Sequence, residues 1–192
     1  WWRGTSQMNV KKAINERRAY RSLLPLEITE GLVRDLAEAA RLAPSCFNNQ
    51  PWRYVFAYEQ EKLKKLHTAL SPGNQWAHNG SLIIVVISSK ESDCVIKDRE
   101  YYLFDTGLAT GFIILRAQEL GLVKHPIAGY NQTRVKEVLG IPADLTVITL
   151  LIIGRRSEVL APSLSEAQME TERKRPERLP PERFVHLNSF KT

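Results

Sequence analysis

Cysteine is scarce in this chain, which has only Cys46 and Cys94 among its 192 residues. The two form no Cys-x-x-Cys pair and are too few to build a disulfide framework. A small secreted fold held together by disulfides is therefore excluded, and a reducing, cytoplasmic compartment is the expected location.

Long hydrophobic runs are lacking too. No apolar stretch reaches the ~18 residues that a membrane-spanning helix needs, and no signal-peptide pattern opens the chain. We therefore expect no association with a membrane. The first methionine is Met8, so residues 1–7 are interpreted as a tag or extension. A content of 43% hydrophobic and 25% charged residues suits a single globular domain over residues 8–192.

Several catalytic signatures are absent as well. The chain has no His-Glu-x-x-His, no Gly-x-Ser-x-Gly, no Walker loop and no Gly-x-Gly-x-x-Gly. The sequence thus predicts no metal site, no catalytic acid or base and no Rossmann-type nucleotide site. The net charge of +6 permits an anionic partner. However, aromatic residues are not interleaved with the basic clusters, so a nucleic-acid partner is not expected.

The hydrophobic patterns predict an α+β fold in which helices separate the strands. Helices are expected at residues 10–18, 29–43, 61–70, 98–120 and 133–139, and strands at residues 54–58, 82–87 and 145–153. The β-branched run at residues 82–87 indicates a central strand covered on both faces. The long helix is expected to be a buried spine, because apolar residues surround most of its circumference: Leu103, Leu108, Phe112, Ile113, Ile114 and Leu115.

The last part of the chain changes character. From Arg155 onward charge and proline dominate, and residues 170–176 cannot form a core. Residues 184–187 (Phe-Val-His-Leu) are apolar again. A tail that merely frayed would have no reason to regain apolar residues, so residues 157–192 are predicted to be an arm that packs on another subunit.

Three short segments carry candidate ligand-binding chemistry. Residues 17–21 (Arg-Arg-Ala-Tyr-Arg) present three guanidinium groups, which pair bidentately with phosphate. Residues 43–52 (Ala-Pro-Ser-Cys-Phe-Asn-Asn-Gln-Pro-Trp) offer neutral hydrogen-bonding groups that suit the pyrimidine edge of a flavin. Residues 125–130 (His-Pro-Ile-Ala-Gly-Tyr) include a glycine that allows a planar ligand to approach the backbone. Taken alone, each has a plainer interpretation: a solvated helix face, a polar loop and a tight connection.

Taken together, these segments resemble the FMN-dependent nitroreductase family in order and spacing, from about Val10 to Leu187. The family pattern runs from Arg-Arg-Ser-x-Arg through Pro-Ser-x-x-Asn-x-Gln-Pro-Trp and a Pro-x-x-Gly-Phe/Tyr turn to a basic tail with Val-His. The block at residues 50–52 (Gln-Pro-Trp) is the most specific match. The resemblance implies an α/β/α sandwich with a central, mainly antiparallel mixed sheet and a C-terminal arm exchanged in a homodimer.

The resemblance also assigns roles to the first segment. Arg17 would hold the FMN phosphate, Arg18 would line the same site, and Arg21 would lie near N1 and O2 of the flavin. Ala19 replaces the usual serine of the family. This removes one hydroxyl contact, at a cost of about 1 kcal/mol if nothing compensates.

In the tail, Arg178 matches a phosphate-binding arginine of the family. A second basic position of the family falls on Pro176, so Lys174 or Arg175 would have to substitute for it.

The remaining predicted contacts concern the flavin ring. The segment that reaches the ring from the partner subunit corresponds to Pro44, Ser45, Cys46 and Asn48, and the nearby Gln50 is also predicted to bind the cofactor. Cys46 stands where the family has small residues, and it is interpreted as a small hydrophobic residue.

A second group of ring contacts is expected from two turns elsewhere in the chain. Asn74 would face the ring from a Gly-Asn turn. In the turn that begins with Pro126 and Ile127, the backbone N–H groups of Ala128 and Gly129 would donate hydrogen bonds to N5 and O4 of the flavin.

The activity implied by the resemblance is that of an oxidoreductase. FMN would take a hydride at N5 from NADH or NADPH and pass electrons to a nitroaromatic, a quinone or another electron-poor small molecule, by a ping-pong mechanism. A non-catalytic FMN carrier, and a family member with dehydrogenase or flavin-modifying activity, remain as alternatives. His125 is interpreted as a packed structural histidine rather than a catalytic one.

Overall fold

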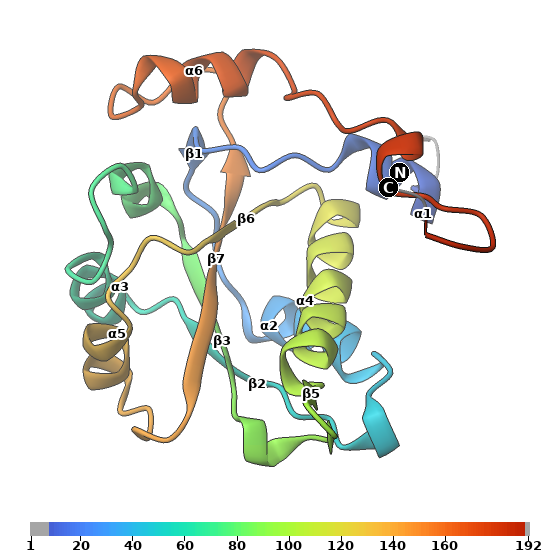
Figure 1. The fold of residues 1–192 in the computed structure, drawn as a ribbon. Coiled ribbons are helices and arrows are strands. Elements are labelled where there is room, and N and C mark those ends of the chain that lie inside the picture. The colour runs from blue at the N-terminus through green and yellow to red at the C-terminus, as the bar shows by residue number, and fades with distance from the viewer. Residues whose placement is uncertain (1–7, 191–192) are drawn as a thin grey trace.

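The computed structural model describes residues 8–190, so the expected extension at residues 1–7 lies outside the described part of the chain. Its centre is a five-stranded sheet (Figure 1). The strands are β1 (Leu23–Leu24), β2 (Arg53–Ala57), β3 (Leu82–Ser88), β6 (Val123–Ile127) and β7 (Thr146–Arg156). They lie in the order β1-β7-β3-β2, with β6 also paired to β7, and each of these pairs is antiparallel.

Helices cover both faces of this sheet. α2 (Glu30–Arg41) and α4 (Tyr102–Glu119) pack on one face, and α3 (Gln60–His67) and α5 (Gln132–Leu139) pack on the other. The predicted α/β/α sandwich with a mainly antiparallel sheet is confirmed. The exchange of the arm between two subunits stays a prediction.

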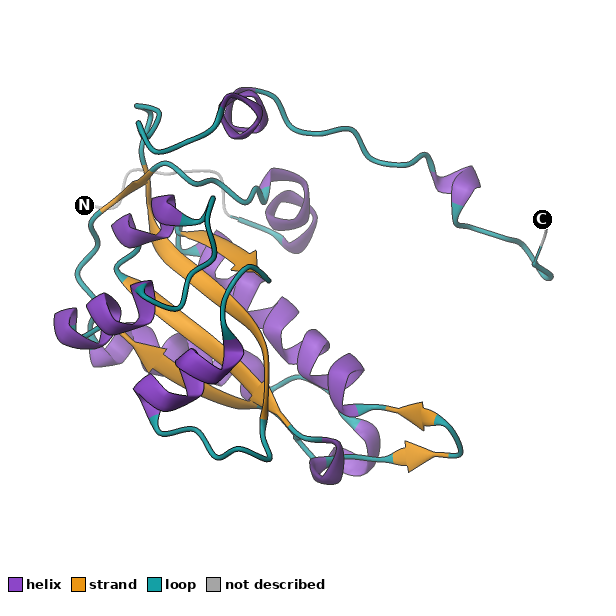
Figure 2. Cartoon of the chain, turned by 60° about the vertical axis from the view of Figure 1, so that its left-hand side comes forward, coloured by secondary structure: helices purple, strands orange, loops and turns teal. Residues whose placement is uncertain are grey.

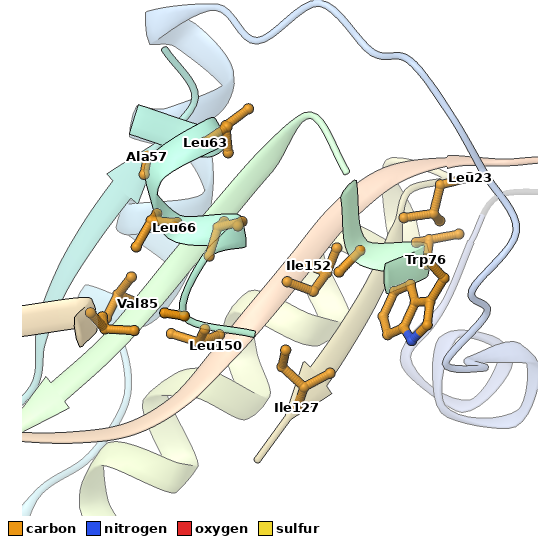
Figure 3. Packing of buried hydrophobic residues seen from close by; sticks show 14 of the residues in the cluster. Leu23, Ala57, Leu63, Leu66, Trp76, Val85, Ile127, Leu150 and Ile152 are labelled. Atoms are coloured by element: carbon orange, nitrogen blue, oxygen red, sulfur yellow. The ribbon is translucent and has the colours of Figure 1, made fainter. Parts of the chain in front are cut away.

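The strand β3 lies at the centre of the core, as predicted. All seven of its residues are buried. Because strand side chains alternate between faces, Ile83 and Val85 join the cluster beneath α3 and α5, while Ile84 and Val86 join the cluster beneath α2 and α4. Figure 3 shows Val85 in the first cluster, close to Leu150 of β7.

The long helix begins later than expected. Residues 98–101, assigned to the helix from the sequence, are not helical: β4 (Val95–Ile96) and β5 (Arg99–Glu100) form a small hairpin before α4. Lys97 turns the chain there with a positive φ of 60°. A tight turn of this kind competes with helix formation, and periodicity alone cannot reveal it.

The expectation that α4 is a buried spine, with apolar residues covered around most of its circumference, is wrong. Its small residues Ala109, Thr110 and Ala117 are buried with Ile113 against the sheet. Large apolar residues on its outer side remain open to solvent: Leu103, Phe104 and Phe112. Small side chains let the helix approach the sheet closely, which leaves the bulky ones on a second, uncovered face.

The segment at residues 123–127 is a strand, whereas the sequence suggested a connection between helices. β6 pairs with β7 in the register Val123 to Gly154 and Ile127 to Leu150. Pro126 cannot donate to a sheet, which restricts a proline to an edge position such as this one. The sequence analysis interpreted Pro126 and Gly129 together as a turn. In the structure the strand continues to Ile127, and the turn starts only at Ala128.

A helix in the tail escaped the sequence analysis. α6 (Glu166–Arg173) begins with a capping box, in which the Ser165 side chain accepts from the backbone N–H of Gln168 and the Gln168 side chain accepts from Ser165. Its charged composition suggested an irregular segment. After α6 the chain runs outward as residues 174–190, called the C-terminal arm below (Figure 2).

The remaining elements are short. The first helix, α1 (Val10–Glu16), ends two residues before the predicted limit, because Arg17 has an extended ψ of 124°. Four 3-10 turns complete the described chain: Cys46–Asn48, Gln75–Asn79, Lys90–Ser92 and Pro181–Arg183. No helix within residues 8–190 is long and apolar enough to span a bilayer.

Candidate functional site

The arginine segment after α1 is bound to α6. Arg18 donates from Nη2 to the backbone oxygens of Thr171 (2.6 Å) and Glu172 (3.1 Å), and Arg21 donates to Oγ1 of Thr171 (3.1 Å). The buried Glu172 carboxylate accepts the backbone N–H groups of Arg21 (2.7 Å) and Ser22 (3.2 Å). These bonds fix the segment in an extended conformation and bring the tail back onto the domain.

Beside this contact lies a basic cavity of about 160 Å³. Its lining residues are Arg17, Arg18, Ala19, Arg21, His125, Thr171, Arg175, Pro176 and Arg178. Four of the predicted cofactor-binding residues from the arginine segment and one from the tail, Arg178, thus line a single cavity. Arg175 also lines the cavity, whereas Lys174 does not. Arg175 is therefore the better candidate for the second basic residue of the family, whose position is occupied by Pro176.

The charge in this cavity is positive and poorly compensated. Burial lowers the pKa of Arg17, and the neighbouring charges of Arg175 and Arg178 lower it further. Within residues 8–190, none of these three side chains forms an ion pair with a carboxylate. Like charges held together in this way favour an anion, since it would relieve their repulsion.

His125 lies at the inner wall of the cavity. Its ring packs against Trp76 at a centroid distance of 4.5 Å, and Nδ1 is 3.1 Å from the backbone oxygen of Tyr20. Burial and the positive charges of Arg21 and Arg17 lower its pKa to about 4. A neutral, packed imidazole positions the arginine segment and does not transfer protons near neutral pH.

Lys124 is a charged neighbour that the sequence analysis missed. Only 3% of it is exposed, and burial together with the charge of Arg17 lowers its pKa to about 8. Its Nζ donates to the backbone oxygen of Leu122 at 3.0 Å and also to the Gln118 side chain. Sequence patterns offered no signal for it, because it is a single lysine within an apolar strand.

Asn74 and Gly129 meet just before the 3-10 turn Gln75–Asn79, which contains Trp76. The Asn74 side chain donates to the Gly129 backbone oxygen at 2.9 Å. A Cβ on Gly129 would lie 2.5 Å from Nδ2 of Asn74, so this contact requires glycine. The Gln168 side chain of α6 donates to the Gly73 oxygen at 2.9 Å and joins this turn to the same helix as the arginines.

The neighbouring predicted residues differ in what they can offer a ligand. Pro126 and Ala128 are exposed, whereas Ile127 is buried with its side chain in the core. Ile127 can therefore contact a ligand only through its backbone.

The loop at residues 43–52 has an unusual backbone. Phe47, Asn48 and Gln50 all have positive φ values, which side chains other than glycine rarely adopt. Two hydrogen bonds hold this conformation: Ser45 Oγ accepts from the Gln50 backbone (3.0 Å), and Asp105 Oδ2 accepts from the Cys46 backbone (2.6 Å). Pro44 and Asn48 are exposed, and Ser45, Cys46 and Gln50 are half-buried. The segment is thus preformed and open to contact.

This loop and the basic cavity lie at opposite ends of α4. The loop is bonded to Asp105 in the first turn of α4, while Gln118 near its last turn bonds Lys124 beside the cavity. Asp105 and Gln118 are 13 residues apart, which corresponds to about 20 Å along the helix. Figure 1 shows the loop and α1 at these two ends. Within one chain, the structure therefore brings together the arginine, Asn74, turn and tail residues, and leaves the loop residues apart.

The two cysteines are close in space, which their spacing in the sequence did not suggest. Cys46 and Cys94 contact each other and Asp93, next to the β4–β5 hairpin. The hydrogen bond from Cys46, burial and the charge of Asp93 raise the pKa of Cys94 to about 11. Cys46 is therefore part of a polar cluster and not simply a small hydrophobic residue.

Comparison with known proteins identifies the family. A provisionally named NADH dehydrogenase/NAD(P)H nitroreductase of Archaeoglobus fulgidus is 30% identical over 147 residues, which cover 74% of this chain and 83% of that protein. The chain belongs to the nitroreductase family. The family profile, described as "Nitroreductase family", matches residues 14–75, which contain both the arginine segment and the loop.

Two further relatives extend the comparison to nearly the whole chain. The NADH dehydrogenase of Thermus thermophilus is 24% identical over 187 residues, covering 81% of this nitroreductase-family chain and 91% of the relative. A crystal structure described as an oxidoreductase containing FMN superposes with a TM-score of 0.81 at 27% identity, over 97% of this chain and 96% of the other. The fold therefore matches from α1 to the tail.

Proposed function

We propose that this protein is an FMN-dependent oxidoreductase that takes electrons from NADH or NADPH and reduces an electron-poor small molecule, such as a nitroaromatic or a quinone. The observation that carries the proposal is the basic cavity, in which Arg17, Arg175 and Arg178 gather without a carboxylate partner. Family membership, the names of the relatives and the FMN in a solved relative support the same assignment.

The chemistry would be that of the cofactor: when bound, FMN accepts a hydride at N5 from the nicotinamide and then reduces the acceptor in a separate half-reaction. The protein's part is to bind and orient. Arg17, Arg18, Arg175 and Arg178 would hold the phosphate, since guanidinium forks pair with its oxygens. The mutual repulsion of these arginines fits a phosphate dianion.

The ring would extend from the cavity toward Asn74. The Arg21 guanidinium lies 6.0 Å from the centroid of the Trp76 ring and donates to Thr171, which fixes a positive charge at the wall of the cavity. A cation there would stabilise negative charge on the reduced ring system. Because Gly129 leaves room beside Asn74, the exposed backbone at Ala128 could approach the ring edge.

The loop residues would act on a second subunit. Pro44, Ser45, Cys46, Asn48 and Gln50 lie at the end of α4 opposite to their own basic cavity, roughly 20 Å away along the helix axis. Because the loop lies apart from its own cavity, we propose that it contributes to the flavin site of a second copy of the chain, in a homodimer with two shared sites.

Exposed apolar surface supports this dimer. A cavity of about 630 Å³ lies between α1, α2 and α4, and its apolar lining includes Val10, Leu42, Phe112 and Leu115. The C-terminal arm carries uncovered residues of its own, among them Phe184 and Val185, which are 61% and 48% exposed. Contiguous apolar surface of this kind marks an interaction site, and the arm would cross onto the partner.

The direct test is a spectrum of the purified protein followed by anaerobic titration with NADH and NADPH. We expect bound FMN that one or both nucleotides reduce, with parallel initial-rate lines when a quinone is the acceptor. A protein that holds FMN but is not reduced by either nucleotide would instead be a carrier. Intersecting lines would contradict the ping-pong mechanism.

Substitution of Arg17 tests the phosphate site. Arg17→Ala removes one charge-assisted contact of about 1.5–3 kcal/mol, so FMN should bind about 10- to 150-fold more weakly. Arg34→Ala, which removes an exposed arginine of α2, is the matched control and should leave the affinity unchanged. Fluorescence titration of the apoprotein with FMN measures both. Equal affinities for the two variants would refute the assignment.

Truncation after Lys174 tests the arm. The shortened chain retains α6 and its Glu172 anchor, so it should stay folded, but it loses Arg175, Arg178 and the apolar residues of the arm. We expect dimerisation and FMN retention to weaken together, measured by light scattering and flavin content. A full-length protein that is a flavin-loaded monomer would disprove the shared-site dimer.

A further inference from the structure

A cluster of potential metal ligands lies at the end of α4 remote from the basic cavity. Sγ of Cys46, Sγ of Cys94 and a carboxylate oxygen of Asp93 lie within 4.8 Å of one another. They come from two segments far apart in the sequence: Cys46 from the preformed loop, and Asp93 and Cys94 from the residues that follow the 3-10 turn Lys90–Ser92. Among residues 8–190 this is the one group of three or more metal-binding side chains at such close range.

The two oxygens of Asp93 have different environments. Oδ1 accepts from the Cys94 backbone N–H (2.8 Å) and from the Asn49 side chain (3.2 Å). Oδ2 is buried and has no hydrogen-bond partner. A buried carboxylate oxygen without a donor is costly, and buried charges in proteins are normally paired or coordinate a metal ion. The Asp93 carboxylate therefore keeps an oxygen without a donor beside the two sulfurs.

A second carboxylate increases the negative charge. Asp105, only 2% exposed, lies beside Asp93, and its Oδ2 accepts the Cys46 backbone N–H. No lysine, arginine or histidine within residues 8–190 forms an ion pair with Asp93 or Asp105. Two adjacent carboxylates with no cationic partner are the arrangement that a bound cation would relieve.

The donor set selects the kind of metal. Thiolates are soft ligands and favour Zn²⁺ over Mg²⁺ or Ca²⁺, which bind oxygen. In a tetrahedral zinc site with Zn–S of about 2.3 Å, two sulfurs are about 3.8 Å apart. Ligand atoms within 4.8 Å of one another reach this spacing by small side-chain rotations.

We propose that Cys46, Asp93 and Cys94 bind a thiophilic divalent cation of the zinc type, with solvent in the fourth position. Asp105 is a positioning residue, because it holds the backbone of Cys46, and Asn49 orients the other two ligands through its bonds to Asp93 and Cys94 (3.3 Å to Sγ). On binding, the two thiols lose their protons to solvent and form metal–sulfur bonds. The cation would join the loop to the β4–β5 hairpin.

The experiment uses full-length protein, reduced and stripped with a chelator, then titrated with Zn²⁺ and separately with Co²⁺. We expect one equivalent of tightly bound metal, visible Co²⁺ bands at longer wavelengths than flavin absorption, and protection of both thiols from a thiol reagent by Zn²⁺. Since the chain has only two cysteines, the thiol count reports on this cluster alone.

Variants separate a site from incidental binding. Cys94→Ser and Asp93→Asn should abolish the Co²⁺ bands, and Asp105→Asn should weaken Zn²⁺ about 10- to 100-fold, as expected for a residue behind the ligands. Asp98→Asn, an exposed aspartate in the same hairpin, is the matched control and should bind like wild type. Circular dichroism checks that each variant is folded.

Three results would overturn the proposal. One is the absence of stoichiometric binding by the wild-type protein. Another is equal Zn²⁺ affinity for Asp93→Asn and Asp98→Asn. The third is a Cys46–Cys94 disulfide that forms in air while the reduced protein ignores Zn²⁺, which would make the cluster a redox pair instead. None of these readouts depends on FMN or on activity.

Discussion

The strand β3 and the C-terminal arm are both apolar, yet they lie in opposite environments. Every residue of β3 is buried, whereas Leu179, Phe184, Val185 and Leu187 of the arm are 48–74% exposed. The strand has neighbouring strands at both edges and helices over both faces, all from its own chain. The apolar side chains of the arm are left uncovered by the described part of the chain. Apolar content predicts that a segment will be buried. Only the three-dimensional fold decides whether its own chain or another one buries it.

A core substitution should show the largest effect. Leu151→Ala in β7 removes a fully buried side chain and should lower the free energy of unfolding by about 2–5 kcal/mol. Leu179→Ala in the arm is the matched control, and in a dilute, flavin-free sample it should change stability by less than about 0.5 kcal/mol. Urea denaturation measures both. Comparable losses would mean that the arm packs on its own chain.

Acid should destabilise the folded domain through His125. Its pKa is about 4 in the folded state against an ordinary value of 6.5, so folding favours the neutral ring. The stabilisation is complete above pH 6.5 and is lost as the pH falls toward 4, by roughly 3 kcal/mol at most. His125→Gln should flatten this part of the stability profile, measured by urea denaturation at several pH values. An unchanged slope would assign the acid sensitivity to other groups.

The contact that joins α6 to the arginine segment should have an intermediate effect. Glu172→Gln replaces one acceptor oxygen with an N–H donor that faces the backbone N–H of Arg21 or Ser22, at a cost of about 1–3 kcal/mol. Glu170→Gln, on the exposed side of α6, should be neutral. Hydrogen exchange rates of the backbone amides in α6 and in residues 20–22 measure the difference between the two variants. Equal protection in both variants would show that α6 is held by other contacts.

The helix cap should have the smallest effect. Ser165→Ala removes the side-chain acceptor of the capping box and should destabilise α6 by about 1 kcal/mol. Ser163→Ala, two residues earlier and outside the box, is the control. Faster hydrogen exchange confined to residues 166–173 is the expected result, and exchange that rises equally in the core would contradict a local role for the cap.

Much of the fold could be predicted from the sequence because local patterns are strong where elements are regular. The run Leu82–Ile87 predicted a buried strand, and Thr29 predicted the start of α2; its side chain does accept from Leu32. Failures occurred where long-range contacts decide. α6 is stabilised by its cap and by Glu172 reaching residues 150 positions away, and β6 is a strand because β7 lies beside it.

The residues of the candidate site also fall into those that could be predicted from local sequence patterns and those that could not. Arg17, Arg21 and Arg178 could be chosen because arginine clusters are visible in sequence and match a family pattern. Arg175 became the better choice than Lys174 only once the cavity was located. The burial of Lys124 could not be predicted, because a single lysine forms no sequence pattern. The contact between Cys46 and Cys94 could not be predicted either, because the two residues are 48 positions apart and only the fold brings them together.

The anchoring of Glu172 has a consequence for how a protease would meet this protein. Cleavage requires a segment that can leave its surroundings, and α6 is tied to residues 18–22 by several hydrogen bonds. The exposed arm beyond it contains Lys174, Arg178 and Arg183, each a target for trypsin, whereas Pro176 protects the bond after Arg175. Proteolysis should therefore stop at the end of α6 and leave the folded domain intact. The rate of cleavage would report how often the arm is not packed on a partner subunit.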